Sequence, residues 1–155
     1  MNPAKTVEES RTTQIHILMP ADSNGFGRMF GGKLMEWIDV VAAVTARRHA
    51  EANVTTAAVD HLEFLSAAHV NDTLVLEGRL TWVGNSSMEV RVDTFVEALN
   101  GARRWVNRAY LVLVALDGKE SPVRVPRLRL TTPEEEEEWD AALRRKAVRD
   151  AFRQK

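Results

Sequence analysis

The sequence contains no cysteine at all. Disulfides, thiolate metal sites and cysteine nucleophiles are therefore excluded, and a reducing compartment is compatible with the chain. An excess of basic charge is also missing, because 21 Lys and Arg stand against 22 Asp and Glu and the formal net charge is -1. A general nucleic-acid binder needs basic charge to neutralise phosphates, so the composition argues against that class.

Long apolar runs are absent as well. No uninterrupted apolar segment approaches the roughly 18 residues that a membrane span needs. The N-terminus, MNPAKTVEES, is polar and has no hydrophobic region of the kind found in a signal peptide. We therefore expect a cytoplasmic protein without a membrane partner. The 155 residues suit one domain with a single hydrophobic core.

The pattern along the chain predicts an α+β domain over residues 12–130, preceded by a flexible lead over residues 1–11. A loop rich in Gly, PADSNGFGRMFGG, precedes one long helix from Gly31 to about Ala50. Short turns at Gly84-Asn85 and Asn100-Gly101 favour a meander of antiparallel strands, with the helix packed on one face. The predicted strands are residues 12–19, 54–65, 73–83, 87–99 and 104–116.

Residues 131–155 are predicted to form a second helix. Thr132 can be its N-cap and Pro133 its first residue, and cationic residues dominate its end as the helix dipole prefers. The five consecutive Glu residues at its start are better explained as a solvated first turn than as a tail that binds a basic partner.

Asp39 is the single charged residue between Trp37 and Ala46. The apolar residues around it predict a helix that is covered on nearly all sides. Burial raises the pKa of a carboxyl group unless cations or donors offset it, and a raised pKa beside a pocket suits a general base. A structural carboxylate that hydrogen bonds locally or pairs with an Arg explains the pattern equally well, so both interpretations stay open at this point.

Two glycines, Gly31 and Gly32, stand at the predicted start of the long helix. The backbone N–H groups there have no partner within the helix, and the positive end of the helix dipole lies behind them. Such a position suits an oxyanion site for a carbonyl group. A Gly-rich turn that only reverses the chain is the alternative explanation.

One ordered pattern runs through the Gly-rich loop and the long helix: Pro20, Asp22, Asn24, Gly27, Phe30, Gly31, Gly32, Met35, Asp39, Arg48 and His49. It continues in VTTAAVD at 54–60, in VGNSSMEV at 83–90 and in VALD at 114–117. The combined pattern resembles the hotdog-fold acyl-CoA thioesterases, in particular the group of bacterial broad-range and mammalian brain-type acyl-CoA hydrolases. The resemblance covers about residues 12 to 127.

The resemblance implies an antiparallel sheet wrapped around one long helix, and a homo-oligomer whose minimal active unit is a dimer. Members of this family typically assemble as a trimer of dimers, which is a homohexamer. The active site lies between two subunits and hydrolyses acyl-CoA to free CoA and a carboxylic acid. Coenzyme A is then part of the substrate, and neither a cofactor nor a metal is needed.

The resemblance also implies roles for individual residues. Asn24 of one chain and Asp39 of its partner are expected to be catalytic, with Asp39 activating water or attacking directly. Gly31 and Gly32 would polarise the thioester carbonyl, and Thr56 would line the same substrate site. The residues expected to contact CoA are Gly84, Ser86, Ser87 and Arg48.

Three positions depart from the family pattern. Asn85 stands where an Arg usually follows Gly84, which implies weaker or differently arranged contacts to the CoA phosphates. Ala67 replaces a common Pro. Asn71 replaces a Gly, and Asn can still adopt the left-handed backbone conformation that such a turn uses.

Two rival functions fit the same fold. A non-catalytic acyl-CoA sensor would bind without turnover, but such sensors tend to carry an added domain, and the presence of both Asn24 and Asp39 favours catalysis. A dehydratase needs a His and an acid in its site, and His61 and Glu63 share one face of a predicted strand. Cross-strand pairing or exposure to solvent explains that pair more simply.

Overall fold

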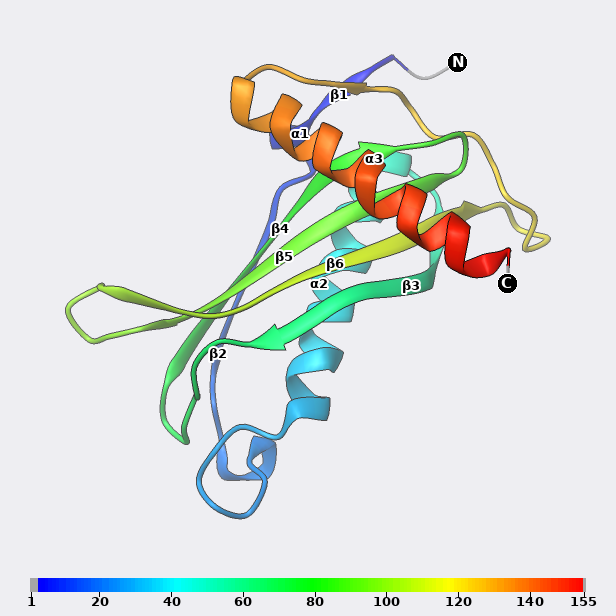
Figure 1. The fold of residues 1–155 in the computed structure, drawn as a ribbon. Helices are drawn as coiled ribbons and strands as arrows, with labels where there is room; N and C mark the ends of the chain where they lie inside the picture. Colours follow the sequence, from blue (N-terminus) through cyan, green and yellow to red (C-terminus); the bar gives the residue numbers. More distant parts are fainter. Residues whose placement is uncertain (1–2, 155) are drawn as a thin grey trace.

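The computed structural model describes residues 3–154, which form a five-stranded antiparallel sheet with a long helix on each face and a separate two-stranded sheet (Figure 1). The α+β arrangement expected for a hotdog fold is confirmed. No helix in the described chain is long and apolar enough to cross a membrane. The elements are β1 Lys5–Thr6, α1 Val7–Ser10, β2 Thr12–Ile17, the 3-10 helix η1 Pro20–Asp22, α2 Gly31–Ala50, β3 Asn53–Phe64, β4 Thr73–Val83, β5 Ser87–Glu97, β6 Arg103–Leu116, β7 Leu128–Arg129 and α3 Pro133–Arg153.

The five-stranded sheet has the order β2-β4-β5-β6-β3, and every pair in it is antiparallel. The predicted meander is confirmed for β4, β5 and β6 but is wrong for β3. This strand pairs with β6 instead of its sequence neighbour β4, because the residues between β3 and β4 carry the chain to the other side of the sheet. The long strand β3 is therefore an edge strand.

The core lies between α2 and the sheet. Leu34, Ile38 and Val41 of the helix are fully buried against apolar residues of the strands. Gly78 of β4 permits the close approach, because a Cβ atom there would lie 2.7 Å from both Val41 Cγ1 and Thr45 Oγ1. This tight contact fixes the position of α2, and with it the direction in which the outer side of the helix faces.

The helix α3 crosses the other face of the sheet (Figure 1). Its predicted N-cap is confirmed, since the Thr132 hydroxyl accepts a hydrogen bond from the Glu135 backbone N–H at 3.1 Å. The indole of Trp139 packs near Trp82 of β4, with ring centroids 6.2 Å apart. The sheet is thus covered on one face by α2 and partly covered on the other by α3.

The flexible lead predicted over residues 1–11 begins with Met1 and Asn2, which lie outside the described residues, whereas residues 5–10 form short elements with defined contacts. The strand β1 pairs in parallel with β7, and Val7 and Ser10 of α1 are buried. Lys5 forms an ion pair with Glu51 at 3.0 Å and donates a hydrogen bond to the carbonyl of Arg48. The segment is ordered by these contacts with distant residues, which its polar composition does not reveal.

Candidate active site

The Gly-rich loop between η1 and α2 has a defined shape and protrudes beyond the end of the sheet (Figure 1). The Phe30 N–H donates to the carbonyl of Asp22 at 2.8 Å, and the Met29 N–H donates to the carbonyl of Ala68 at 2.8 Å. Gly25 and Gly27 adopt positive φ angles of 91° and 76°, which only Gly adopts without cost. The loop composition noted in the sequence is therefore required by its backbone conformation.

Asn24 lies in this loop with an exposed side chain. Its Oδ1 accepts a hydrogen bond from the backbone N–H of Phe26 at 2.9 Å, which fixes the orientation of the side-chain amide. The Asn24 Nδ2 group has no hydrogen-bond partner within residues 3–154. An amide oriented in this way presents its N–H donors outward, where they are able to meet a carbonyl oxygen or a water.

The N-terminus of α2 has no side-chain cap. Phe30 at the N-cap position offers no acceptor, and no acidic residue lies in the first turn. The first intrahelical acceptor is the carbonyl of Phe30, which accepts from the N–H groups of Lys33 and Leu34. The N–H groups of Gly31 and Gly32 therefore have no acceptor within the helix and are free to donate to a ligand. Together with the helix dipole, they form a site that favours a developing negative charge.

Asp39 projects from the middle of α2 toward β3. The Thr56 hydroxyl donates a hydrogen bond of 2.7 Å to Asp39 Oδ1. Both residues line a hollow of about 360 Å³ between the helix and the edge of the sheet. Its lining is mostly apolar: Gly32, Met35, Glu36, Ile38, Asp39, Thr56, Val59, Leu62 and Leu111. The Asp39 carboxylate is therefore held by one hydrogen bond at the wall of an apolar hollow.

The expected burial of Asp39 is not found in the isolated chain, where this residue is exposed. Apolar neighbours are present as predicted, but Met35, Val40 and Val59 are themselves 46%, 44% and 46% exposed. The sheet covers only one side of α2, so the side that carries Asp39 stays open. An additional surface is needed to enclose this carboxylate.

The structure brings together some of the predicted site residues and separates others. Gly32, Thr56 and Asp39 line one hollow, whereas Asn24 lies outside it on the protruding loop. Gly32 and Asp39 are two helical turns apart, a rise of about 10 Å, so a single carbonyl group does not reach both.

The residues predicted to contact CoA lie away from that hollow. Gly84, Ser86 and Ser87 form the turn between β4 and β5, where the Gly84 N–H donates to the carbonyl of Ser87 at 2.8 Å. Arg48, at the end of α2, is engaged within the chain, since its Nη1 donates to the carbonyl of Arg11 at 2.9 Å. This contact gives Arg48 a structural role.

Sequence reasoning missed two arginines beside the β4–β5 turn. The guanidinium of Arg127 donates to the carbonyl of Gly84, and Arg124 Nη1 lies 3.4 Å from Asn85 Oδ1. They therefore bring positive charge to the turn where Asn85 replaces the usual Arg. The two arginines are far from this turn in the sequence, so the sequence does not indicate that they lie beside it. A tertiary contact brings them there, in which the Val125 N–H donates a hydrogen bond to the carbonyl of Asn85.

The pair that suggested a dehydratase lies elsewhere. His61 Nε2 is 3.3 Å from Glu63 Oε2, and both side chains are exposed. His61 lines a hollow between β3 and α3 instead of the one that contains Asp39. The structure thus gives no support to a His and acid pair at the Asp39 site. The residues described also include no cluster of three His, Asp or Glu able to hold a metal ion.

Comparison with known proteins decides the family. The sequence model of the thioesterase superfamily matches residues 26–100. The uncharacterized acyl-CoA thioester hydrolase YkhA of Bacillus subtilis is 41% identical over 132 residues, which cover 84% of this chain and 75% of that protein. The chain belongs to the hotdog-fold acyl-CoA thioesterases. The cytosolic acyl coenzyme A thioester hydrolase of Rattus norvegicus is 32% identical over 146 residues, but the chain spans only 38% of that longer relative.

Solved structures of this thioesterase family superpose closely on the chain. A hexameric acyl-CoA thioesterase has a TM-score of 0.93 and 39% identity, with 97% of each chain covered. An acyl-CoA hydrolase from Staphylococcus aureus, solved with butyryl coenzyme A and coenzyme A, has a TM-score of 0.92 and 36% identity over 97% of this chain and 93% of that one. The family and fold inferred from the sequence motifs are thereby confirmed.

Proposed function

We propose that this protein hydrolyses acyl-CoA thioesters to coenzyme A and a carboxylic acid, in a site shared by two copies of the chain. The observation that carries the proposal is the Asp39–Thr56 pair at the wall of the apolar hollow. The acyl chain lies along the apolar lining, and the thioester carbonyl meets free N–H donors at the start of α2.

Asp39 acts as the general base. Thr56 holds Oδ1, so Oδ2 accepts the proton of a water molecule while the water oxygen attacks the thioester carbonyl carbon. The carbonyl oxygen gains negative charge, which the backbone N–H groups near Gly32 and the amide of Asn24 stabilise. The C–S bond then breaks, and the thiolate of coenzyme A leaves and takes up a proton.

The geometry supports a shared site. Gly32 lies two helical turns from Asp39, and Asn24 lies outside the hollow. A single chain therefore does not bring Asn24, the helix start and Asp39 to the same carbonyl group. A second copy, placed with its loop over the open side of α2, supplies Asn24 and the helix start to the Asp39 of the first. The hexameric assembly of a 39% identical thioesterase supports such an oligomer, as a trimer of dimers.

Variants made in the S. aureus hydrolase give further support. Structures exist of that protein with Ala in place of an Asn, an Asp and a Thr. The three replaced residues follow one another at the same sequence spacings as Asn24, Asp39 and Thr56 do in this chain. The two sets therefore match in residue type and in order.

The turn proposed to bind coenzyme A is open to solvent. Gly84, Ser86 and Ser87 offer backbone and hydroxyl groups at an accessible turn, and Arg124 adds a nearby exposed cation. Arg124 then takes the place of the family Arg that Asn85 replaces. A guanidinium suits the phosphates of coenzyme A because it forms two parallel hydrogen bonds to one phosphate group.

The test is release of free coenzyme A from a panel of acyl-CoAs, short to long. We expect Asp39→Asn to lower kcat by about a hundredfold or more, since general base catalysis contributes that much. Glu36→Gln is the matched control, because Glu36 is an exposed carboxylate on the same hollow and pairs with Lys33. Binding without release by the wild type would support a sensor, and full activity of Asp39→Asn would remove Asp39 from the mechanism.

A further inference from the structure

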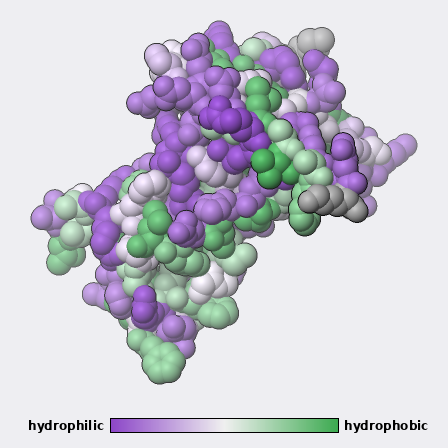
Figure 2. Space-filling view, viewed as in Figure 1, coloured by the Kyte–Doolittle hydropathy of each residue, from purple (hydrophilic) through white to green (hydrophobic). Residues whose placement is uncertain are grey.

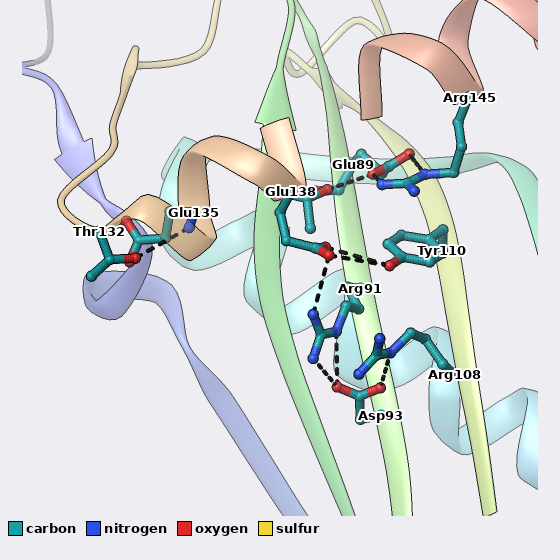
Figure 3. Close-up of polar contacts among 10 residues, drawn as sticks. Glu89, Arg91, Asp93, Arg108, Tyr110, Thr132, Glu135, Glu138 and Arg145 are labelled. Atoms are coloured by element: carbon teal, nitrogen blue, oxygen red, sulfur yellow. Dashed lines mark hydrogen bonds and ion pairs between the residues drawn. The ribbon is translucent and has the colours of Figure 1, made fainter. Parts of the chain in front are cut away.

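A second hollow, of about 290 Å³, lies on the face of the sheet that carries α3. It is distinct from the Asp39 site, because α2 and Asp39 occupy the opposite face (Figures 1 and 3). Five arginines dominate its lining, and we refer to it as the arginine hollow. The residues around it are Arg11, Gly78, Arg79, Arg91, Arg103, Arg108, Glu77, Asp93, Phe95 and Trp105.

Four of the five arginines are neutralised by carboxylates of the chain. Asp93 accepts from Arg91 at 2.8 Å and from Arg108 at 2.6 Å, and Arg91 also reaches Glu138 of α3 at 3.3 Å (Figure 3). The remaining two pairs are Arg103 with Glu77 at 2.8 Å and Arg11 with Glu8 at 2.9 Å.

Arg79 is the exception. It is half-buried and makes no hydrogen bond or ion pair within residues 3–154. In the β4–β5 ladder it stands directly opposite Arg91, and like charges in that position repel each other. Burial, followed by the nearby cation of Arg91, lowers the pKa of Arg79, and Arg11 acts in the same direction. The carboxylates of Glu138 and Asp93 act in the opposite direction but do not cancel the shift. Arg79 is thus a half-buried cation that has carboxylates nearby but forms no direct ion pair with any of them among the described residues.

We propose that the arginine hollow binds a phosphate group, either as free phosphate or as the phosphate of a nucleotide. Arg79 supplies a guanidinium that no carboxylate pairs with directly, and Arg91 and Arg11 line the same hollow and act on Arg79 electrostatically. A dianion with several oxygens suits this arrangement better than a carboxylate, because guanidinium groups from different directions each reach a different oxygen. A phosphate bound in the arginine hollow offsets the repulsion between the guanidinium groups of Arg79 and Arg91.

Calorimetric titration of the assembled protein with inorganic phosphate tests the proposal. We expect saturable binding that weakens at least tenfold in Arg79→Gln and stays unchanged in Arg47→Gln. Arg47 is a suitable control because it is an exposed arginine on α2. Titration with acetate at matched ionic strength is expected to show no binding. Titration with ADP in place of phosphate separates the two sources, since a nucleotide ligand binds more tightly than the free ion.

Thermal unfolding supplies a second readout that does not depend on heat of binding. Phosphate is expected to raise the Tm of the wild type but not that of Arg79→Gln, because only the folded wild type binds it. In phosphate-free buffer, Arg79→Gln is expected to have a higher Tm than the wild type, since it removes a repelled, half-buried charge. Equal phosphate binding by the wild type and Arg79→Gln, or no saturable binding by the wild type, would overturn the proposal.

Discussion

The proposed chemistry depends on how one carboxylate is held. Thr56 occupies one oxygen of Asp39, so the other faces a hollow with apolar walls. The residue type and its apolar neighbours were predictable from the helix sequence. The contact with Thr56 was not, because it joins α2 to a strand that the amino-acid pattern alone does not place beside it.

Replacement of Thr56 tests this positioning role. We expect Thr56→Ala to lower kcat by about tenfold to a hundredfold with little change in KM. A decrease of that size corresponds to the loss of one hydrogen bond to a charged group. Thr56→Ser is expected to recover most of the rate because it restores the hydroxyl. Steady-state kinetics on both variants gives the answer, and a Ser variant as slow as the Ala variant would argue against the hydrogen bond.

His49 shows a second effect at the scale of single residues. Its side chain is fully buried at the end of α2, and its Nε2 lies 2.8 Å from the carbonyl oxygen of Pro126. Burial is the main cause that lowers the pKa of His49 below its ordinary value of 6.5, and the cations of Lys5 and Arg127 act in the same direction. The folded protein therefore resists protonation at this site, whereas the unfolded chain does not.

This difference predicts the direction of an acid effect. Above pH 6.5 both states hold neutral His49, so the residue adds no pH dependence. As the pH falls below 6.5, the unfolded state binds the proton more readily, and the free energy of unfolding decreases. Urea unfolding at pH 7 and pH 5 is expected to show a smaller decrease for His49→Gln than for the wild type. Arg47→Gln, at an exposed position on the same helix, is the control, and its decrease is expected to match the wild type.

At the scale of elements, α3 is attached to the sheet by charge as well as by apolar contacts. Ala142 is its only fully buried residue among those described, and Trp139 packs against the core while partly buried. Glu89 of β5 is 1% exposed and accepts two hydrogen bonds from Arg145 of the helix, at 2.7 and 3.0 Å (Figure 3). The Arg145 guanidinium also lies 3.6 Å from the ring centre of Tyr110. Arg145 therefore joins the helix to two strands.

Loss of Arg145 is expected to leave a buried carboxylate unpaired. Arg145→Gln should reduce the free energy of unfolding by about 3 kcal/mol, a cost typical of breaking one side of a buried ion pair. The neighbouring Arg144→Gln is the matched control, because that side chain is exposed and makes no ion pair among the residues described. Chemical denaturation measures both, and equal stability of the two variants would contradict this role.

The sequence predicted most elements well and their arrangement only in part. The helix bounds at 31 and 50 were found because the segment has a clear start and end, and Asn71 adopts the expected left-handed φ of 77°. The edge position of β3 and the docking of β1 against β7 were not predicted. Both depend on contacts between distant parts of the chain, and neither turn residues nor periodicity encodes such contacts.

At the scale of the whole molecule, apolar exposure points to a second copy. Phe26 on the protruding loop is 87% exposed, and Phe64 and Leu65 at the end of β3 are 49% and 51% exposed. Figure 2 shows apolar side chains over this lower part of the molecule. Together with the unpaired edge of β3, they offer a surface that another chain is able to cover. Under the proposed shared site, a second copy covers this surface and supplies the burial of Asp39 that the single chain does not show.

Mixing two inactive variants tests the shared site most directly. Asn24→Ala and Asp39→Asn are purified separately, unfolded together in denaturant and refolded, and release of coenzyme A is measured. Because a mixed dimer places both substitutions in one site and neither in the other, random pairing restores about a quarter of the wild-type sites. We expect recovery of that order from two nearly inactive parents. No recovery from a mixture shown to contain mixed oligomers would place Asn24 and Asp39 in the same subunit's site and contradict it.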